Sequence, residues 1–259
     1  MLEPWAFRHK AWKKVPYFHL FENKFLNRAR TIFATGDLET ENLKKLLPRA
    51  KVSCIPLGLN SSQKPDYLNA RTKLGWRHDE KIILYLSRIH PKKGLIDLVK
   101  SLFDLKSHLS ERVRLVVVGD GDVDYLNQIQ KFISENKNSL PPIDIVGPVW
   151  GEEKWQYLQG ADLFCLPTYS ENFGLAVLEA AFVGTPVLTT DQTPWLSHKN
   201  DSGFIITEPG IKSLKDGLDK FLKLNWSLTN RESFASDMKQ KYSWETLAPK
   251  YLECFVDAL

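Results

Sequence analysis

Residues 162–190 read DLFCLPTYSENFGLAVLEAAFVGTPVLTT and predict a strand, a helix and a second strand in succession. Asp162–Leu166 predicts a short strand. Phe173-Gly174-Leu175 predicts the start of a helix, and Gly184 its end. Pro186–Thr190 then predicts the next strand. This order indicates a parallel strand–helix–strand unit.

Two carboxylates lie around the start of that helix. Glu171 comes on the loop at the carboxyl end of the first strand, and Glu179 lies about two turns into the helix. The first N–H groups of a helix are unpaired and carry partial positive charge, which favours a phosphate. Because carboxylates repel phosphate, we expect Glu171 and Glu179 to bind hydroxyl groups. Hydroxyl binders beside a phosphate site point to a nucleotide joined to a sugar.

The alternation of strands and helices continues through the chain from Lys81 onward. Strands that alternate with helices predict an α/β fold with a doubly wound parallel sheet, which binds its ligands at the carboxyl ends of the strands. The other expected strands are Ile82–Ser87, Val113–Val118, Ile143–Gly147 and Gly203–Ile206, and the other expected helices are Leu95–Leu109, Tyr125–Ile133, Glu152–Gln159, Ile211–Leu224, Leu228–Lys241 and Trp244–Leu259.

Residues 1–60 differ, because they hold too few elements for a complete three-layer domain. We expect helices at Phe21–Arg30 and Leu38–Leu47, and strands at Thr31–Thr35 and Val52–Pro56. Asn60–Pro65 has the composition of a linker.

A basic loop follows the strand that ends at Ser87. Arg88 leaves the end of that strand, and Lys93 and Gly94 come just before the next helix. A guanidinium and an ammonium group at this place can clamp a diphosphate. His90 lies in the same loop, and a lone histidine is more often structural than catalytic.

Two further loops follow predicted strands. Gly119-Asp120-Gly121 lacks the residues of an EF-hand and the third glycine of a dinucleotide fingerprint, so it predicts a turn that lines the nucleotide crevice or caps the next helix. Val149 follows the Ile143–Gly147 strand. It could pack on a nucleobase, although a plain turn accounts for this loop equally well.

Composition excludes several classes of protein. The 259 residues are 43% hydrophobic and 25% charged, which is typical of a soluble globular protein. No apolar run has the roughly 18 residues of a transmembrane helix, and no signal peptide is evident. The three cysteines and six histidines have neither disulfide nor metal-ligand spacing, so we expect no metal site. A reducing cytoplasm is the expected location.

The net charge of +4 is concentrated at the N-terminus. Residues 1–30 carry seven Lys and Arg against two Glu, a balance of +5, interleaved with aromatic residues. Such a segment either contacts a membrane surface or another anionic partner, or is a solvated helix over part of a core. Membrane contact would place the protein at the inner membrane face. Nothing indicates nucleic-acid binding.

The basic loop, the Gly119-Asp120-Gly121 turn and the Glu171–Glu179 segment, taken in order, resemble the nucleotide-sugar domain of retaining family-4 glycosyltransferases of GT-B fold. The likeness is strongest over residues 81–210. It implies a Rossmann-like donor domain at 61–241, a remnant of the N-terminal acceptor domain at 1–60, and a C-terminal helix at 242–259 that returns toward the N-terminal part.

The resemblance also implies roles for individual residues. Arg88, Lys93 and Glu171 would be the catalytic groups, with the first two on the donor diphosphate and Glu171 on the sugar hydroxyls. Glu179 would bind the ribose hydroxyls. The other implied donor-binding residues are Gly119, Val149, Asn172, Phe173, Gly174 and Leu175.

The implied reaction transfers a hexosyl group from a nucleotide-diphosphate sugar to a glycan or lipid-linked acceptor, as in polysaccharide biosynthesis, with retention and without a metal or other cofactor. The sequence departs from the family in its short N-terminal part, which lacks about one hundred residues of the first domain. Two alternatives therefore remain: a nucleotide-sugar-binding fragment, or half of a split enzyme that is inactive alone.

Overall fold

A computed structural model describes residues 11–60, 62–105 and 112–257. Its larger unit is a six-stranded sheet in the order β5-β4-β3-β6-β7-β8, in which all neighbours are parallel. The strands are β3 (Glu80–Leu86), β4 (Arg112–Val118), β5 (Ile143–Gly147), β6 (Leu163–Leu166), β7 (Val187–Thr190) and β8 (Phe204–Thr207). The predicted doubly wound parallel sheet is therefore confirmed.

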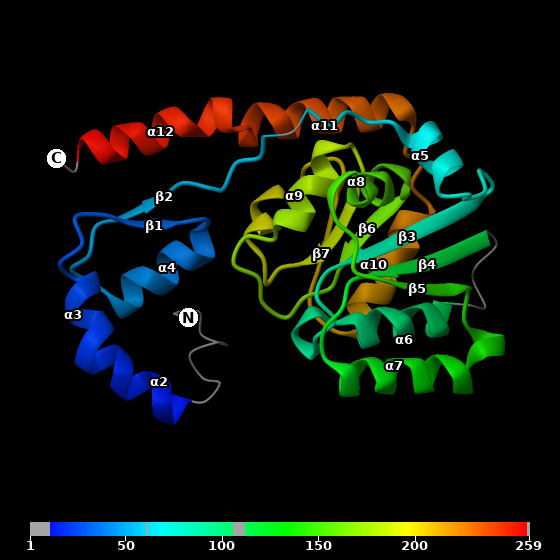
Figure 1. The fold of residues 1–259 in the computed structure, drawn as a ribbon, viewed down its shortest axis with the longest axis horizontal. Coiled ribbons are helices and arrows are strands. Elements are labelled where there is room, and N and C mark those ends of the chain that lie inside the picture. Colours follow the sequence, from blue (N-terminus) through cyan, green and yellow to red (C-terminus); the bar gives the residue numbers. More distant parts are fainter. Residues whose placement is uncertain (1–10, 61, 106–111, 258–259) are drawn as a thin grey trace.

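Helices cover both faces of this sheet (Figure 1). Helices α6 (Leu95–Leu105), α7 (Val123–Glu135) and α10 (Ile211–Leu222) pack on one side. The other side carries α5 (Tyr67–Lys73), α8 (Gly151–Gly160), α9 (Leu175–Phe182) and α11 (Leu228–Tyr242). Strands β3, β4 and β6 are apolar almost throughout because both of their faces are buried.

The chain reverses its direction of travel across the sheet between β3 and β6. From β3 it proceeds outward to β4 and β5, then returns to place β6 on the other side of β3. Strands β3 and β6 are paired at only two positions, where Ile83 lies opposite Leu163 and Leu84 lies opposite Phe164. At such a switch point the two loops at the carboxyl ends diverge and leave a crevice for a ligand.

Asp162 fixes the amino end of the β3–β6 junction. Its Oδ2 accepts hydrogen bonds of 2.7 Å from the backbone N–H of Ile82 and from Arg71 Nη1. Its Oδ1 accepts one from the Tyr67 hydroxyl, also at 2.7 Å. Burial and this carboxylate raise the pKa of Tyr67 to about 12, and burial lowers the pKa of nearby Arg231 to about 10. This buried network joins α5 and α11 to the sheet.

The smaller, N-terminal unit has a two-stranded parallel sheet of β1 (Ile32–Ala34) and β2 (Val52–Cys54). Helix α4 (Asp37–Leu46) connects these strands, and α2 (Ala11–Tyr17), a π-helical turn (Phe18–Glu22) and α3 (Asn23–Leu26) precede them. A separate small core contains Phe18, Ala34, Leu43 and Leu47.

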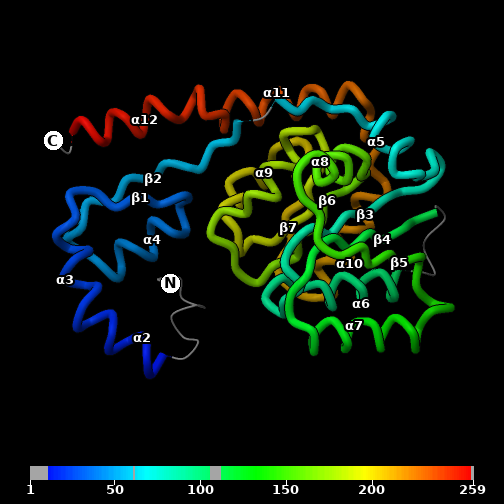
Figure 2. Tube along the Cα trace, viewed as in Figure 1, coloured from blue at the N-terminus to red at the C-terminus, as the bar shows by residue number. Residues whose placement is uncertain are grey.

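The C-terminal helix α12 (Trp244–Val256) leaves the large unit and lies along the N-terminal strands (Figure 2). The Phe33 ring packs against the rings of Tyr251 and Phe255, with centroids 5.3 and 5.6 Å apart. The Tyr251 hydroxyl donates to the Ile55 carbonyl at 3.1 Å. The two units are therefore held together by the end of the chain as well as by residues 55–66.

Several element boundaries differ from those expected. The predicted Phe21–Arg30 helix is wrong in extent, because helical structure already runs from Ala11 and stops at Leu26. Helix α7 begins at Val123 because the Asp122 carboxylate caps it by accepting from the Tyr125 N–H at 2.9 Å. Helix α5 was not predicted. The expected ends at Leu109 and Leu259 lie outside the described residues.

An aromatic cluster of Phe173, Trp195, Phe204 and Tyr242 supports the loop between β6 and α9. Trp195 is fully buried in this cluster, and its indole N–H donates to the Phe173 carbonyl at 2.6 Å. One side chain from beyond β7 thus fixes the backbone of the loop that carries Glu171.

We expect Trp195→Phe to lower the free energy of unfolding by about 2 kcal/mol, because the buried Phe173 carbonyl loses its donor and a gap opens in the cluster. Urea denaturation measures this change. The exposed Trp150 provides the control, since Trp150→Phe should change the stability by no more than about 0.5 kcal/mol. Equal stability of the two variants would show that the indole does not support the loop.

Candidate functional site

The loop after β3 carries Arg88 and Lys93 and is attached to the two neighbouring loops by its backbone. The Ile89 N–H donates to the Asp120 carbonyl at 2.6 Å, and the Ile89 carbonyl accepts from the Asp122 N–H at 2.8 Å. On the other side, the Lys92 carbonyl accepts from the Tyr169 N–H at 2.8 Å. The loops after β3, β4 and β6 therefore form one connected edge.

Two glycines allow this close approach. A Cβ on Gly94 (φ 71°) would lie 2.1 Å from the Pro167 carbonyl oxygen. A Cβ on Gly119 (φ 138°) would lie 2.0 Å from the Ser87 carbonyl oxygen. Both positions also have backbone conformations that favour glycine. Gly119 therefore allows the loop after β4 to pack closely against the loop after β3.

His90 caps the short 3₁₀ turn of Pro91–Lys93, where its Nδ1 accepts from the Lys92 N–H at 3.1 Å. This contact is structural, because it fixes the backbone of the turn that carries Lys93.

Lys93 and Glu171 meet across the junction of β3 and β6. The Lys93 ammonium forms a direct ion pair with Oε2 of Glu171, and both side chains are largely buried. The Glu171 N–H donates to the Gln192 carbonyl at 3.1 Å, which holds the backbone at this point. Two residues that are 78 positions apart in the chain thus share one site.

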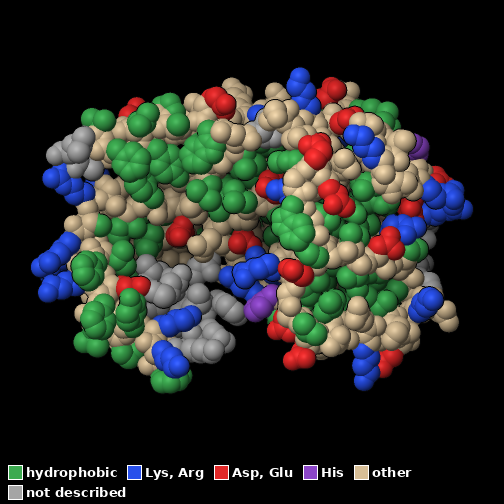
Figure 3. Space-filling view, in the orientation of Figure 1, with side chains coloured by type: hydrophobic (Ala, Val, Ile, Leu, Met, Phe, Trp, Pro, Cys, Tyr) green, Lys and Arg blue, Asp and Glu red, His purple; other side chains and the backbone are tan. Residues whose placement is uncertain are grey.

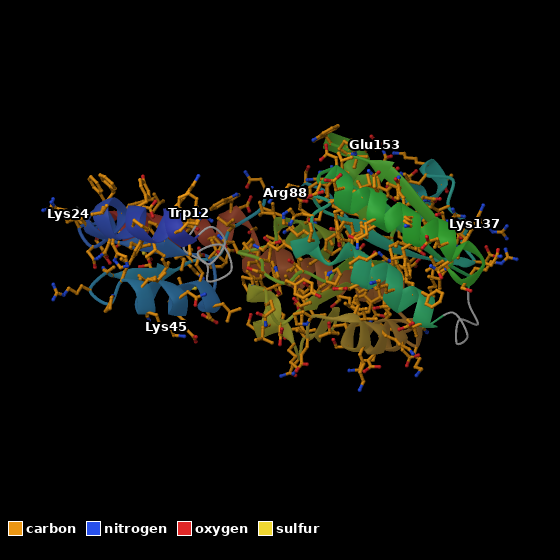
Figure 4. All side chains as sticks on the ribbon, turned by 90° about the horizontal axis from the view of Figure 1, so that it is seen from below. Trp12, Lys24, Lys45, Arg88, Lys137 and Glu153 are labelled. Atoms are coloured by element: carbon orange, nitrogen blue, oxygen red, sulfur yellow. The ribbon has the colours of Figure 1, made fainter. Side chains whose placement is uncertain are left out.

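Arg88 follows the carboxyl end of β3, in the same loop as Lys93, and is exposed. Among the described residues, no carboxylate forms an ion pair with it. Figure 4 shows Arg88 on the side of the large unit that faces the N-terminal unit. In the space-filling view a notch separates the two units, with Lys, Arg and His side chains gathered at its upper end (Figure 3). Arg88 is therefore accessible on the side of the large unit that faces the N-terminal unit.

Helix α9 begins beside the Lys93–Glu171 pair. Gly174 is its N-cap in a left-handed conformation (φ 79°, ψ 63°), and Leu175 is its first residue. The first N–H groups of a helix have no acceptor within the helix, and an anion can bind there. The Phe173 side chain is only 4% exposed, in the aromatic cluster, so this residue can offer a ligand only its backbone. Asn172 is exposed, and its carbonyl accepts from Thr35 Oγ1 at 3.3 Å.

Glu179 lies in α9 and pairs with a lysine that the sequence analysis missed. Lys154 Nζ in α8 is 2.7 Å from Oε1 of Glu179. Lys154 is in the first turn of the helix that follows β5, and therefore near the carboxyl edge of the sheet. This position is the sequence signal that could have identified it as a site residue. Val149, in that same loop, is half-buried and packs against the main core.

Every predicted site residue is therefore at the carboxyl edge of the sheet. Among the described residues, no group of three or more His, Cys, Asp and Glu side chains is arranged to hold a metal ion. The three cysteines are unpaired, and burial raises the pKa of the Cys165 thiol. Within the described part of the chain, no helix has the length and apolar character needed to cross a bilayer.

A cavity of about 590 Å³ opens at the opposite, amino edge of the sheet. Asp162 and Arg231 are part of its wall. Their charged groups are already engaged in internal contacts, since Arg231 Nη2 donates to the Ala161 carbonyl at 2.6 Å and Asp162 accepts from three donors. The cavity therefore borders the structural network and brings together none of the predicted site residues.

The family model described as "Glycosyl transferases group 1" matches residues 66–241. A D-inositol 3-phosphate glycosyltransferase of Nocardia farcinica is 30% identical over 253 residues, covering 92% of this chain and 55% of the relative. A phosphatidyl-myo-inositol mannosyltransferase of Mycobacterium leprae is 25% identical over 206 residues, covering 78% of this chain and 52% of the relative. The chain thus spans about half the length of the curated relatives it matches.

A similar solved structure is Anabaena Alr3699/HepE in complex with UDP-glucose, with a TM-score of 0.80 at 18% identity, covering 99% of this chain and 70% of that one. At this identity the likeness establishes the fold, which is the α/β arrangement of GT-B proteins. The family model covers more than half of the chain. This protein therefore belongs to the group 1 glycosyltransferases.

Proposed function

We propose that the chain binds a nucleotide-diphosphate sugar in the crevice beside the β3–β6 junction and serves the transfer of its hexosyl group, with retention, to a glycan or lipid-linked acceptor. The observation that carries this proposal is that the Lys93–Glu171 pair joins the two loops at the β3–β6 switch point, where Arg88 follows β3 and α9 begins after β6. The solved relative that holds UDP-glucose supports this class of donor.

The diphosphate would lie between Arg88, Lys93 and the first N–H groups of α9. A Lys ammonium has three donors, so Lys93 can keep Glu171 and still donate to a phosphate oxygen. Arg88 supplies a planar group that suits phosphate and is free of carboxylate partners within the described residues. Glu171 would then accept from hydroxyls of the sugar, and Glu179 from those of the ribose.

In the proposed reaction an acceptor hydroxyl oxygen bonds to the anomeric carbon, the bond between this carbon and the distal phosphate oxygen breaks, and the nucleoside diphosphate leaves with the proton of that hydroxyl. Negative charge on the distal phosphate grows as this bond lengthens. Fixed cations and aligned N–H groups stabilise this charge most in the transition state. We propose that they do so without a metal ion.

Arg88→Ala should weaken binding of UDP or GDP by at least tenfold, since a hydrogen bond to a charged group contributes about 1.5–3 kcal/mol. Isothermal titration with both nucleotides measures the effect. Arg112→Ala is the matched control, because Arg112 is an exposed arginine near the amino edge of the sheet that pairs with Asp79. Equal affinity in all three proteins would exclude this diphosphate site.

Release of nucleoside diphosphate from UDP-glucose or GDP-mannose should continue at an unchanged rate in excess EDTA. The reason is that Arg88, Lys93 and the α9 N–H groups supply the positive charge that a metal supplies in other enzymes. A loss of activity that added Mg²⁺ restores would refute metal independence.

A second candidate is favoured by the N-terminal unit, which has only two strands in its described part. In this alternative the chain binds the sugar nucleotide but transfers no sugar alone, as a binding fragment or as half of a split enzyme. Tight nucleotide binding without release of product would support this candidate.

For the acceptor we propose a lipid-linked molecule reached at an anionic membrane, through residues 1–30. In the described part of this segment the exposed apolar side chains are Trp12, Tyr17, Leu20, Phe21 and Phe25, and the cations are Lys13, Lys14, Lys24, Arg28 and Arg30. Trp12 is in α2 and Lys24 is in α3 (Figure 4). Exposed aromatic groups beside cations favour an anionic interface.

Trp12→Ala should reduce co-sedimentation with vesicles of phosphatidylcholine and phosphatidylglycerol, because it removes an aromatic group that can enter the interface. Trp150→Ala is the matched control, since Trp12 and Trp150 are both 74% exposed. An equal reduction in both variants, or no binding by the unchanged protein, would contradict this contact.

A further inference from the structure

The pairing of Lys154 with Glu179 differs from the exposed ion pairs of this protein. The Glu179 side chain is only 14% exposed, and the Lys154 side chain 25%. By contrast, the Lys223–Asp219 pair is of similar length, at 2.6 Å, and is exposed. A carboxylate that is largely removed from water is costly to leave unpaired, whereas an exposed ion pair contributes little. The Lys154 ammonium therefore stabilises the charge and the orientation of Glu179.

Lys154 lies at the same edge of the sheet as the crevice. Helix α8 begins at Gly151, directly after the loop at the carboxyl end of β5, so Lys154 is in its first turn. Its ammonium also lies 5.1 Å from the centroid of the Trp155 ring, which limits its positions. Lys154 is in α8 and Glu179 is in α9, and the two helices pack against each other. The orientation of the carboxylate thus depends on the packing of two helices.

The contact occupies one oxygen of the carboxylate. Lys154 donates to Oε1, and among the described residues no other side chain donates to Glu179. A carboxylate has two oxygens and about four acceptor positions, so Oε2 can still accept from neighbouring hydroxyl groups. A pair of adjacent hydroxyls, such as that of a ribose, matches one carboxylate oriented in this way.

We propose that Lys154 is a positioning residue, which holds Glu179 so that its carboxylate accepts hydrogen bonds from the ribose hydroxyls of the donor. This inference rests on the proposed function, which assigns those hydroxyls to Glu179. Lys154 acts through Glu179 and does not contact the diphosphate. Each of the two carboxylates of the site then has its own lysine, with Lys93 on Glu171 and Lys154 on Glu179.

The test compares nucleotides with and without the hydroxyl pair. Binding of UDP and GDP, and of their 2′,3′-dideoxy counterparts, is measured by titration calorimetry for the unchanged protein, Lys154→Met, Lys154→Arg and Glu179→Gln. Lys154→Met should weaken binding of the better natural nucleotide roughly tenfold, the loss typical of a charged hydrogen bond, and should leave the dideoxy form unaffected. Lys154→Arg should restore part of the affinity because it keeps the charge.

A double variant adds a second criterion. If Lys154 acts through Glu179, Lys154→Met combined with Glu179→Gln should bind no more weakly than Glu179→Gln alone. Lys223→Met is the matched control, since it breaks an exposed pair of similar length and should change no affinity.

The outcomes separate this inference from the proposed function. Equal weakening of the natural and dideoxy nucleotides by Lys154→Met would overturn the positioning role, because it would indicate contact with the phosphates or a general loss of structure. Unchanged affinity in Lys154→Met would also overturn it. If the unchanged protein binds none of these nucleotides, the proposed function itself fails.

Discussion

The short junction between β3 and β6 is the constraint on which both the sheet and the site depend. Only two residue pairs register across it, so other contacts must hold its ends. At the amino end, Asp162 accepts from the Ile82 N–H and from side chains of α5. At the carboxyl end, the Lys92 carbonyl accepts from the Tyr169 N–H and from Thr168 Oγ1. The site thus forms where the sheet itself has the least hydrogen bonding.

The charges at this junction are largely balanced before any ligand binds. Lys93 pairs with Glu171, and Lys154 pairs with Glu179, so neither pair adds net charge to the crevice. In the proposed function Arg88 and the start of α9 supply the net positive charge that attracts a diphosphate, while Lys93 donates a hydrogen bond to it and stays paired with Glu171. The Lys154–Glu179 pair would contribute orientation. Since paired groups need little rearrangement when a ligand arrives, the two ion pairs keep these side chains in fixed positions.

Much of this architecture follows from local sequence, and the exceptions have identifiable causes. The central strands contain uninterrupted apolar runs at residues 82–86 and 163–166, and the rule that ligand-binding residues follow the carboxyl ends of parallel strands correctly predicts that Arg88, Lys93 and Glu171 lie at one edge. Local sequence gave no sign of α5, which is short and has few buried residues. The burial of Phe173 depends on Trp195 and Tyr242, which are distant in the chain, and the partner of Glu179 depends on how α8 packs against α9.

The N-terminal unit is coupled to the same loop that carries Glu171. Thr35 Oγ1 donates to the Asn172 carbonyl, and a Cβ on Gly36 would lie 2.7 Å from Cβ of Pro194, next to Trp195. Helix α12 meanwhile holds the N-terminal strands through Phe33 and therefore limits how far the two units can separate. The loop between β6 and α9 is therefore the physical link between the two units, because both of them contact its backbone.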